Sequence, residues 1–201
     1  TEPRTLHLGD GTPIGGTFFA SLDGAPEVAV VTSSAGDIAG NDLHGLRDKS
    51  LLSFDPWKVK KLEIQRGRET VLLEHPSDGW VIRRPIEAPA DGPTVTDFLN
   101  ALEGLRARSF VAEQPTGAVL RRHRLAPPAA PLTILQEGWD VEKTVLIGGK
   151  VPKDGKGSAP SEGGRYARTV GRDPVFTIPG DFWEKVTTRL ADLRRKDLLS
   201  L

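Results

Sequence analysis

An internal repeat is the feature that most constrains how this chain can fold. Residues 5–9 (Thr-Leu-His-Leu-Gly) resemble residues 144–148 (Thr-Val-Leu-Ile-Gly), at an offset of 139 (144 − 5). Residues 46–54 (Leu-Arg-Asp-Lys-Ser-Leu-Leu-Ser-Phe) match residues 193–201 (Leu-Arg-Arg-Lys-Asp-Leu-Leu-Ser-Leu), at an offset of 147 (193 − 46). The offset changes across the Gly- and Pro-rich segment 148–164. We interpret this segment as a long loop, where an insertion is tolerated.

The period of this repeat predicts tandem domains. A unit of about 147 residues is far longer than the repeats of 20–50 residues that build solenoids and propellers. We therefore predict that residues 1–54 are the closing part of a preceding repeat unit and that residues 55–201 are one complete repeat unit. The chain has no methionine, even at position 1, which suggests a piece of a longer protein whose ends need not be domain borders.

Short strands and two amphipathic helices determine the predicted fold class. Segments of four to six residues with β-forming side chains alternate with Gly, Pro and Asp turn signals. After Asp91-Gly92-Pro93, apolar residues recur at helical spacing, and a second such stripe follows Asp181. We predict an α+β fold in which antiparallel β-meanders are each followed by a packed helix, in two repeat-related lobes. The two apolar stripes are Val95, Phe98, Leu102 and Leu105, and Phe182, Val186, Leu190 and Leu193.

Composition excludes several classes of protein. Lys plus Arg and Asp plus Glu each number 27, so the chain lacks the one-signed field of a nucleic-acid-coating protein. Cysteine is absent, which excludes a disulfide framework or a thiol nucleophile. No apolar run approaches the roughly 18–20 residues that span a bilayer. We therefore expect no nucleic-acid partner, and membrane attachment only through a segment outside this fragment.

No motif in the sequence predicts catalysis, a cofactor or a metal. The four histidines (His7, His44, His75 and His123) lack the spacing of metal ligands. The Gly-Lys-rich segment after residue 148 departs from the phosphate-binding loop pattern in both spacing and the following residues. A serine nucleophile on a Gly-x-Ser-x-Gly turn is also missing. We expect neither a catalytic, a cofactor-binding nor a metal-binding residue, and we expect that the protein is not an enzyme.

Two features remain as candidates for surface contact. Trp139, in Glu137-Gly138-Trp139-Asp140, is predicted to lie at a hairpin tip, where an aromatic ring can contact a partner. Arg121, Arg122 and Arg124 form a dense basic run, which could contact phosphate or anionic lipid headgroups. The run lacks interleaved aromatic residues, so we favour its interpretation as a solvated connector.

Three further segments resemble one bacterial family. They are residues 46–55 followed by Val59-x-x-Leu62-x-Ile64, the run from Gly79-Trp80 to Asp91, and the run from Phe98 to Arg108. Together they resemble a domain of unknown function, DUF4340, over residues 46–201. The resemblance implies an extracytoplasmic location and a membrane-anchored auxiliary subunit of an ABC transport system, including gliding-motility types. It supplies no catalytic residues.

These observations lead to one expected function and two alternatives. We expect a non-enzymatic, extracytoplasmic interaction module of a membrane-anchored ABC-transport accessory protein, with an ABC permease or an envelope component as its protein partner. A hydrolase or transferase with a dispersed site would instead have a deep pocket with convergent polar groups and shifted acid pKa values. A sugar- or lipid-binding module would have an exposed aromatic platform or a lined apolar cleft.

Overall fold

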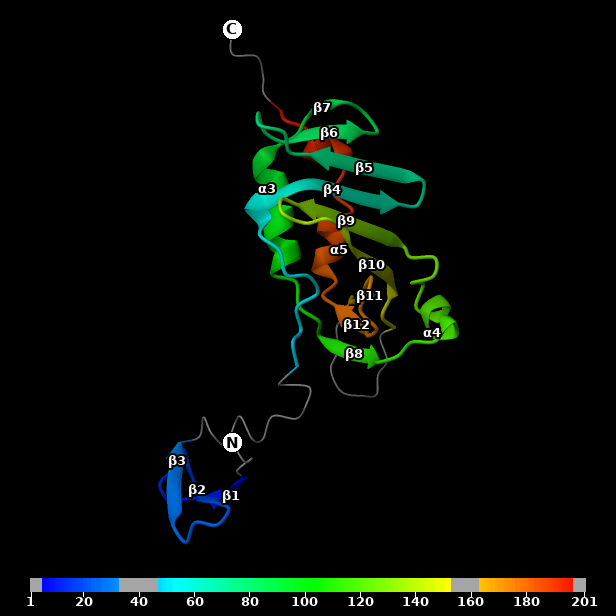
Figure 1. Ribbon diagram of the computed structural model, residues 1–201. Coiled ribbons are helices and arrows are strands. Elements are labelled where there is room, and N and C mark those ends of the chain that lie inside the picture. Colours follow the sequence, from blue (N-terminus) through cyan, green and yellow to red (C-terminus); the bar gives the residue numbers. More distant parts are fainter. Residues whose placement is uncertain (1–4, 33–46, 153–162, 197–201) are drawn as a thin grey trace. The chain divides into compact units, whose positions relative to one another are not determined.

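Antiparallel β-sheet makes up most of the described structure, together with a few helices. The computed structural model describes residues 5–32, 47–152 and 163–196 and divides into two units, Thr1–Asp48 and Lys49–Leu201 (Figure 1). The second unit begins before the predicted repeat border at Asp55, because Leu51 and Leu52 are buried in its core. That the units are copies of one another stays a prediction.

The first unit contains a three-stranded antiparallel sheet in the order β1-β2-β3. Its strands are β1 (Leu6–Gly11), β2 (Thr17–Leu22) and β3 (Val28–Thr32). Ala20 is its only buried hydrophobic residue among those described, whereas Leu6, Val28 and Val30 are more than half exposed. The helix predicted over residues 41–47 lies almost wholly outside the described residues.

The second unit is built on a nine-stranded antiparallel sheet in the order β7-β6-β5-β4-β9-β10-β11-β12-β8. Hairpins connect most neighbouring strands, as the turn signals predict, and β4 pairs with the distant β9 to join the two halves of the sheet. The strands are β4 (Val59–Arg66), β5 (Glu69–Glu74), β6 (Val81–Arg84), β7 (Ala88–Pro89), β8 (Ser109–Ala112), β9 (Ala130–Gln136), β10 (Lys143–Lys150), β11 (Arg165–Thr169) and β12 (Val175–Ile178).

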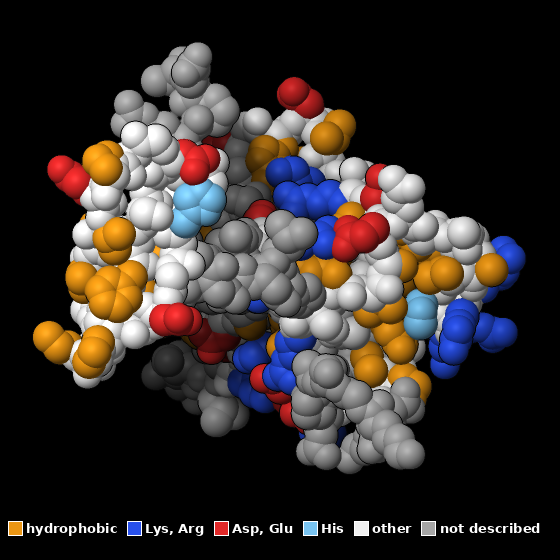
Figure 2. Space-filling model, turned by 90° about the horizontal axis from the view of Figure 1, so that it is seen from below, with side chains coloured by type: hydrophobic (Ala, Val, Ile, Leu, Met, Phe, Trp, Pro, Cys, Tyr) orange, Lys and Arg blue, Asp and Glu red, His pale blue; other side chains and the backbone are white. Residues whose placement is uncertain are grey.

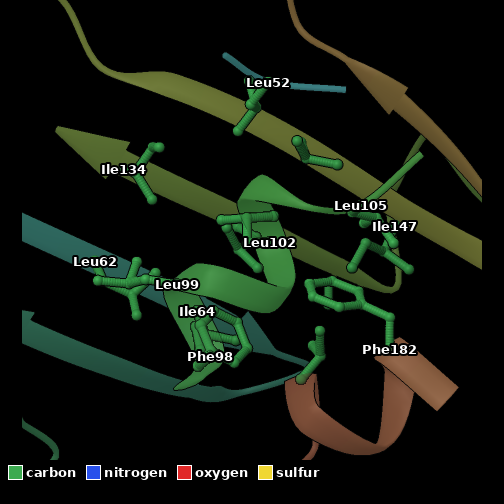
Figure 3. Packing of buried hydrophobic residues seen from close by; sticks show 14 of the residues in the cluster. Leu52, Leu62, Ile64, Phe98, Leu99, Leu102, Leu105, Ile134, Ile147 and Phe182 are labelled. Carbon is green, nitrogen blue, oxygen red and sulfur yellow. The ribbon is translucent and has the colours of Figure 1, made fainter. Parts of the chain in front are cut away.

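The longest helix, α3 (Gly92–Glu103), forms where the sequence predicts it. The Asp91 side chain accepts a hydrogen bond from the backbone N–H of Thr94 and caps the first turn. Burial follows the predicted stripe, because Val95, Phe98, Leu99 and Leu102 are buried against the sheet. Figure 3 shows Phe98, Leu99 and Leu102 packed among apolar residues of the sheet and near Phe182 of α5 (Asp181–Val186).

The C-terminal helical segment differs from the prediction of one helix. It consists of α5 and a separate short helix, α6 (Leu190–Leu193). The Thr187 hydroxyl donates to the carbonyls of Trp183 and Glu184, and such local hydrogen bonds compete with helix continuation. Two other short elements are the 3₁₀ turn η1 (Pro56–Lys58) and α4 (Gly117–Arg122), and the sequence did not predict α4.

Candidate functional site

The C-terminal turn of α4 carries the basic run Arg121–Arg124. The Arg124 N–H donates to the Arg121 carbonyl, and the Leu125 N–H donates to the Leu120 carbonyl. This pair of bonds is the Schellman pattern that ends helices in a left-handed residue, a position that glycine normally fills. Here Arg124 fills it with φ of 55°, the one positive-φ residue other than glycine in the described chain. The run is therefore a tightly folded helix end, in contrast to the connector that we predicted.

A bulge in β10 brings this turn against the sheet. The β10–β11 register shifts between the pairs Ile147↔Ala167 and Lys150↔Arg165, and the bulged residues are glycines. The Gly149 N–H donates to the His123 carbonyl at 2.8 Å. A Cβ atom on Gly148 would lie 2.3 Å from that same carbonyl oxygen, so only glycine permits this approach.

The α4 turn and the two strands enclose a hollow of about 320 Å³, which we call the cationic pocket. Arg165, on β11, is its buried member, with 9% of its surface exposed. Its guanidinium donates to the Gly148 carbonyl at 2.8 Å and lies 3.3 Å from the ring centroid of Trp183. The His123 ring packs on the Tyr166 ring, with centroids 3.9 Å apart. The pocket is lined by Arg122, His123, Arg124, Gly149, Lys150, Arg165 and Tyr166.

Among the described residues, no carboxylate pairs with the positive charges of the cationic pocket. In residues 5–32, 47–152 and 163–196, neither Lys150 nor Arg165 forms an ion pair with Asp or Glu, and the same holds for Arg122 and Arg124. Burial, and then the charge of Arg124, lower the pKa of Arg165. Burial, and then the charge of Arg122, lower the pKa of His123, which favours the neutral imidazole. The pocket can therefore hold an anion and offers it donors that are already charged.

Two of the predicted contact residues line the cationic pocket, and two do not. Arg122 and Arg124 line it, whereas Arg121 is exposed on α4 with its guanidinium beside Gly117. Figure 2 shows basic side chains gathered at the edge of the second unit where Figure 1 places α4. Trp139 lies elsewhere, in the β9–β10 hairpin. It is partly buried against the core, and the Lys143 ammonium lies 3.8 Å from its ring centroid.

The sequence did not single out Arg165 or Tyr166 as site residues, and Lys150 entered only as part of the Gly-Lys-rich segment that departs from the phosphate-binding loop pattern. One signal could have found the two cations, because the sequence match aligns Lys150 with Gly11 and Arg165 with Phe18, neither of which is charged. An exposed aromatic residue was also missed. Trp57, in η1, is 79% exposed, more than any other tryptophan.

Metal and membrane features were also considered for the described part of the chain. Its residues contain no group of three or more His, Cys, Asp or Glu side chains placed to hold a metal ion. Among its helices, none combines the length and apolar character needed to cross a membrane. The guanidinium and ammonium groups that line the cationic pocket support electrostatic binding of an anion.

The fold and the site define a mostly antiparallel β protein with a few helices and a cationic pocket at the edge of its larger unit. The sequence model of one family, Domain of unknown function (DUF4340), matches residues 1–128 and again residues 80–201. Because these matches span the chain, the protein belongs to the DUF4340 family, in agreement with the resemblance seen in its motifs. No curated protein and no solved structure matches it significantly.

Proposed function

We propose that this chain is a non-enzymatic, extracytoplasmic interaction module that contacts an anionic group of its partner through the cationic pocket. One observation carries the proposal: four cationic side chains line a single hollow without a carboxylate counter-ion among the described residues. Such a cluster creates a local positive field that attracts anions and orients them during association. The four are Arg122, Arg124, Lys150 and Arg165.

The chemistry of these side chains favours recognition over turnover. Arginine and lysine stay protonated near neutral pH and act only as hydrogen-bond donors, so they bind and orient an anion. A general base needs a free lone pair within reach of the proton it removes. In the pocket, the neutral imidazole of His123 would be the main candidate for that role, and its ring packs at a tilt against the Tyr166 ring.

The proposed setting is a membrane-anchored accessory protein of an ABC transport system. The partner would be an ABC permease or another envelope component, and the membrane segment would lie outside this fragment. Support for this setting comes from the family resemblance of the motifs in residues 46–108.

We further propose that the α+β units are repeat-related lobes, and the strand registers support this. In the first unit the pairs Leu8↔Ala20 and Gly11↔Phe18 flank a bulge. The sequence offset is 139 for residues of β1 and 147 for residues of β2. With these offsets the two pairs correspond to Ile147↔Ala167 and Lys150↔Arg165, which flank the bulge in β10. The β2–β3 pairs convert in the same way to β11–β12 pairs.

Burial at equivalent positions also supports the repeat. Leu6 is 54% exposed and Val28 is 67% exposed, whereas their counterparts Val145 and Val175 are fully buried. In the second unit, β9 pairs with β10 and β8 pairs with β12, so additional strands lie beside the counterparts of β1 and β3. The two family matches overlap over residues 80–128, as expected if one model fits a repetitive chain in two frames. The three-stranded sheet therefore has the pattern of a closing part of a larger unit.

Charge reversal tests the proposed function. The double variant Arg122→Glu/Arg124→Glu should lose co-purification with the ABC permease of its own transport system from detergent-solubilised membranes. Arg68→Glu is the matched control, because Arg68 is an exposed arginine in the β4–β5 turn, outside the cationic pocket. Equal recovery of the permease by the wild type, the double variant and the control would contradict the proposal.

A further inference from the structure

We propose that the cationic pocket is a binding site for a phosphomonoester, that is, a phosphate group with one organic substituent. This inference rests on the proposed function in that both require an anion at this pocket, and it adds the class of ligand. It stands on three features of the described residues: a pair of like charges across the sheet, an arginine in a glycine position, and a buried arginine without a carboxylate partner.

The pair of like charges is Lys150 and Arg165, which lie opposite each other in the β10–β11 ladder. Like charges at directly opposed positions destabilise a sheet. The fold does not require them, because the corresponding pair in the first unit, Gly11↔Phe18, has the same register and carries no charge. Two cations at paired ladder positions that both line the cationic pocket are therefore better explained by a ligand that both contact than by the needs of the sheet.

Arg124 provides a second, independent indication. It occupies the left-handed position of the Schellman turn with φ of 55°, where any residue other than glycine is strained. The side chain extends over Gly149, since a Cβ atom there would lie 3.3 Å from its Cδ. A strained residue at a site is a reason to look for function in its side chain. Here the guanidinium group borders the cationic pocket.

Arg165 is the anchor of the proposed site. It is about nine-tenths buried, and among the described residues its guanidinium donates to the Gly148 carbonyl. The Trp183 ring against its face fixes the plane of the guanidinium. Burial of a charge without an opposite charge is unfavourable, as the lowered pKa of this group indicates. A bound anion would supply the missing charge and accept hydrogen bonds from the remaining N–H groups.

The shape of the pocket favours a phosphate with a substituent over a carboxylate. The cations come from a helix turn and two strands, so they approach a central anion from several directions. A tetrahedral phosphate offers three terminal oxygens to such donors, whereas a carboxylate offers two oxygens in one plane. The hollow of about 320 Å³ has room beyond the phosphate, and the contacting rings of His123 and Tyr166 form a wall for the attached group.

Titration calorimetry and chemical-shift mapping on the full 201-residue chain test this inference. The soluble probes are glycerol phosphate, inorganic phosphate and acetate, and the membrane probes are phosphatidylcholine vesicles with and without phosphatidic acid. We expect glycerol phosphate to bind more tightly than inorganic phosphate and acetate, with shifts at Gly149 and Tyr166. Lys150→Gln and Arg124→Gly should each weaken it about 10-fold or more, while Arg68→Gln leaves it unchanged. Binding to the phosphatidic acid vesicles alone would identify a lipid headgroup as the source of the phosphomonoester.

Several results would overturn the inference. One is equally weak binding of acetate and glycerol phosphate, and another is chemical-shift changes at residues away from Gly149 and Tyr166. Equal affinity of the Arg68→Gln and Lys150→Gln variants for glycerol phosphate, or no binding to any probe, would also contradict it. Its failure can be distinguished from failure of the proposed function. Loss of permease co-purification in the charge-reversed variant without phosphomonoester binding would refute only the inference. Phosphomonoester binding with unchanged co-purification would refute only the proposed contact with the partner.

Discussion

Lys150 and Arg165 are paired across the β10–β11 ladder, immediately after the bulge at Gly148 and Gly149, and both line the cationic pocket. In the proposed repeat, the corresponding pair in β1–β2 is Gly11 and Phe18. The same backbone arrangement thus occurs with and without the two charges. The two positive charges are therefore not needed for the strand pairing, and we assign them to the cationic pocket.

The first prediction concerns stability. Lys150→Gln should raise the free energy of unfolding by about 0.2–1 kcal/mol, because it removes the repulsion across the ladder. Urea denaturation at low salt measures this change, and added salt should reduce it because Lys150 is exposed. Arg68→Gln, with the same charge change elsewhere, should stay within about 0.5 kcal/mol of the wild type. A clear loss of stability in Lys150→Gln would assign the lysine a structural role instead.

Arg124→Gly is predicted to stabilise the protein while weakening anion binding. Glycine adopts the left-handed conformation of this turn without the strain that a Cβ atom introduces, and we expect a gain of up to about 1 kcal/mol. Thermal unfolding and glycerol phosphate titration measure the two effects on the same sample. If the variant is destabilised, the arginine stem contributes packing over Gly149 that outweighs the strain.

The sequence predicted the helix α3 well because its local signals agree. Asp91 caps the first turn, Pro93 favours helix initiation, and the apolar stripe has helical period. The helix α4 was missed because Gly117–Arg122 is short and has only two large apolar residues, Val119 and Leu120, both partly buried. Such a helix is held by its Thr116 cap and its Schellman turn, which periodicity does not reveal.

The candidate site was only half visible in the sequence. Arg122 and Arg124 stand out as part of a basic run, but Lys150 and Arg165 join them through the register of β10 and β11. A bulge sets that register, and a shift of one residue in the pairing would turn the side chains to the other face. Alternation of apolar residues predicts the strands themselves but does not locate a bulge between them.

Acid should weaken the fold through His123. Its pKa is lowered in the folded state by burial and then by Arg122, so the unfolded chain takes up a proton first as the pH falls. The contribution of neutral His123 to stability is complete above about pH 6.5, the ordinary histidine value, and is lost as the pH falls through its lowered pKa. Relative to His123→Gln, the wild type should therefore lose stability between pH 7 and 5 in urea denaturation. Parallel pH profiles would contradict this.

A bound anion should reverse that effect of His123. Sulfate keeps two negative charges from pH 5 to 7, so its affinity should rise in acid as His123 becomes protonated, and rise less in His123→Gln. The substitution leaves the other charged and titratable residues lining the cationic pocket unchanged, so the difference between the two proteins reports on His123. These residues are Arg122 and Arg124 of the α4 turn, Lys150 of β10, and Arg165 and Tyr166 of β11.

Gly148→Ala should disturb both the fold and the cationic pocket. Its Cβ atom would lie 2.3 Å from the His123 carbonyl oxygen, so the α4 turn or β10 has to move. We expect a loss of about 1–3 kcal/mol in the free energy of unfolding, typical of overpacking, together with weaker binding of glycerol phosphate. Gly92→Ala is the control, because a Cβ atom there meets no neighbour within 4 Å. Equal stability of both variants would show that the turn adapts without cost.

The last prediction uses the two sheets that share a register. If residues 5–32 are the closing part of a larger unit, β1–β3 lack the neighbouring strands and helices that protect β10–β12. Small sheets with exposed apolar residues are weakly stable, and their amides exchange with solvent through frequent local opening. Peptides covering Thr17–Leu22 should therefore exchange about 100-fold faster than peptides covering Arg165–Thr169, after correction for intrinsic rates. The comparison is matched because Ala20 and Ala167 occupy equivalent ladder positions. Equal protection of the two segments would mean that the three-stranded sheet is stable by itself, against its interpretation as part of a larger unit.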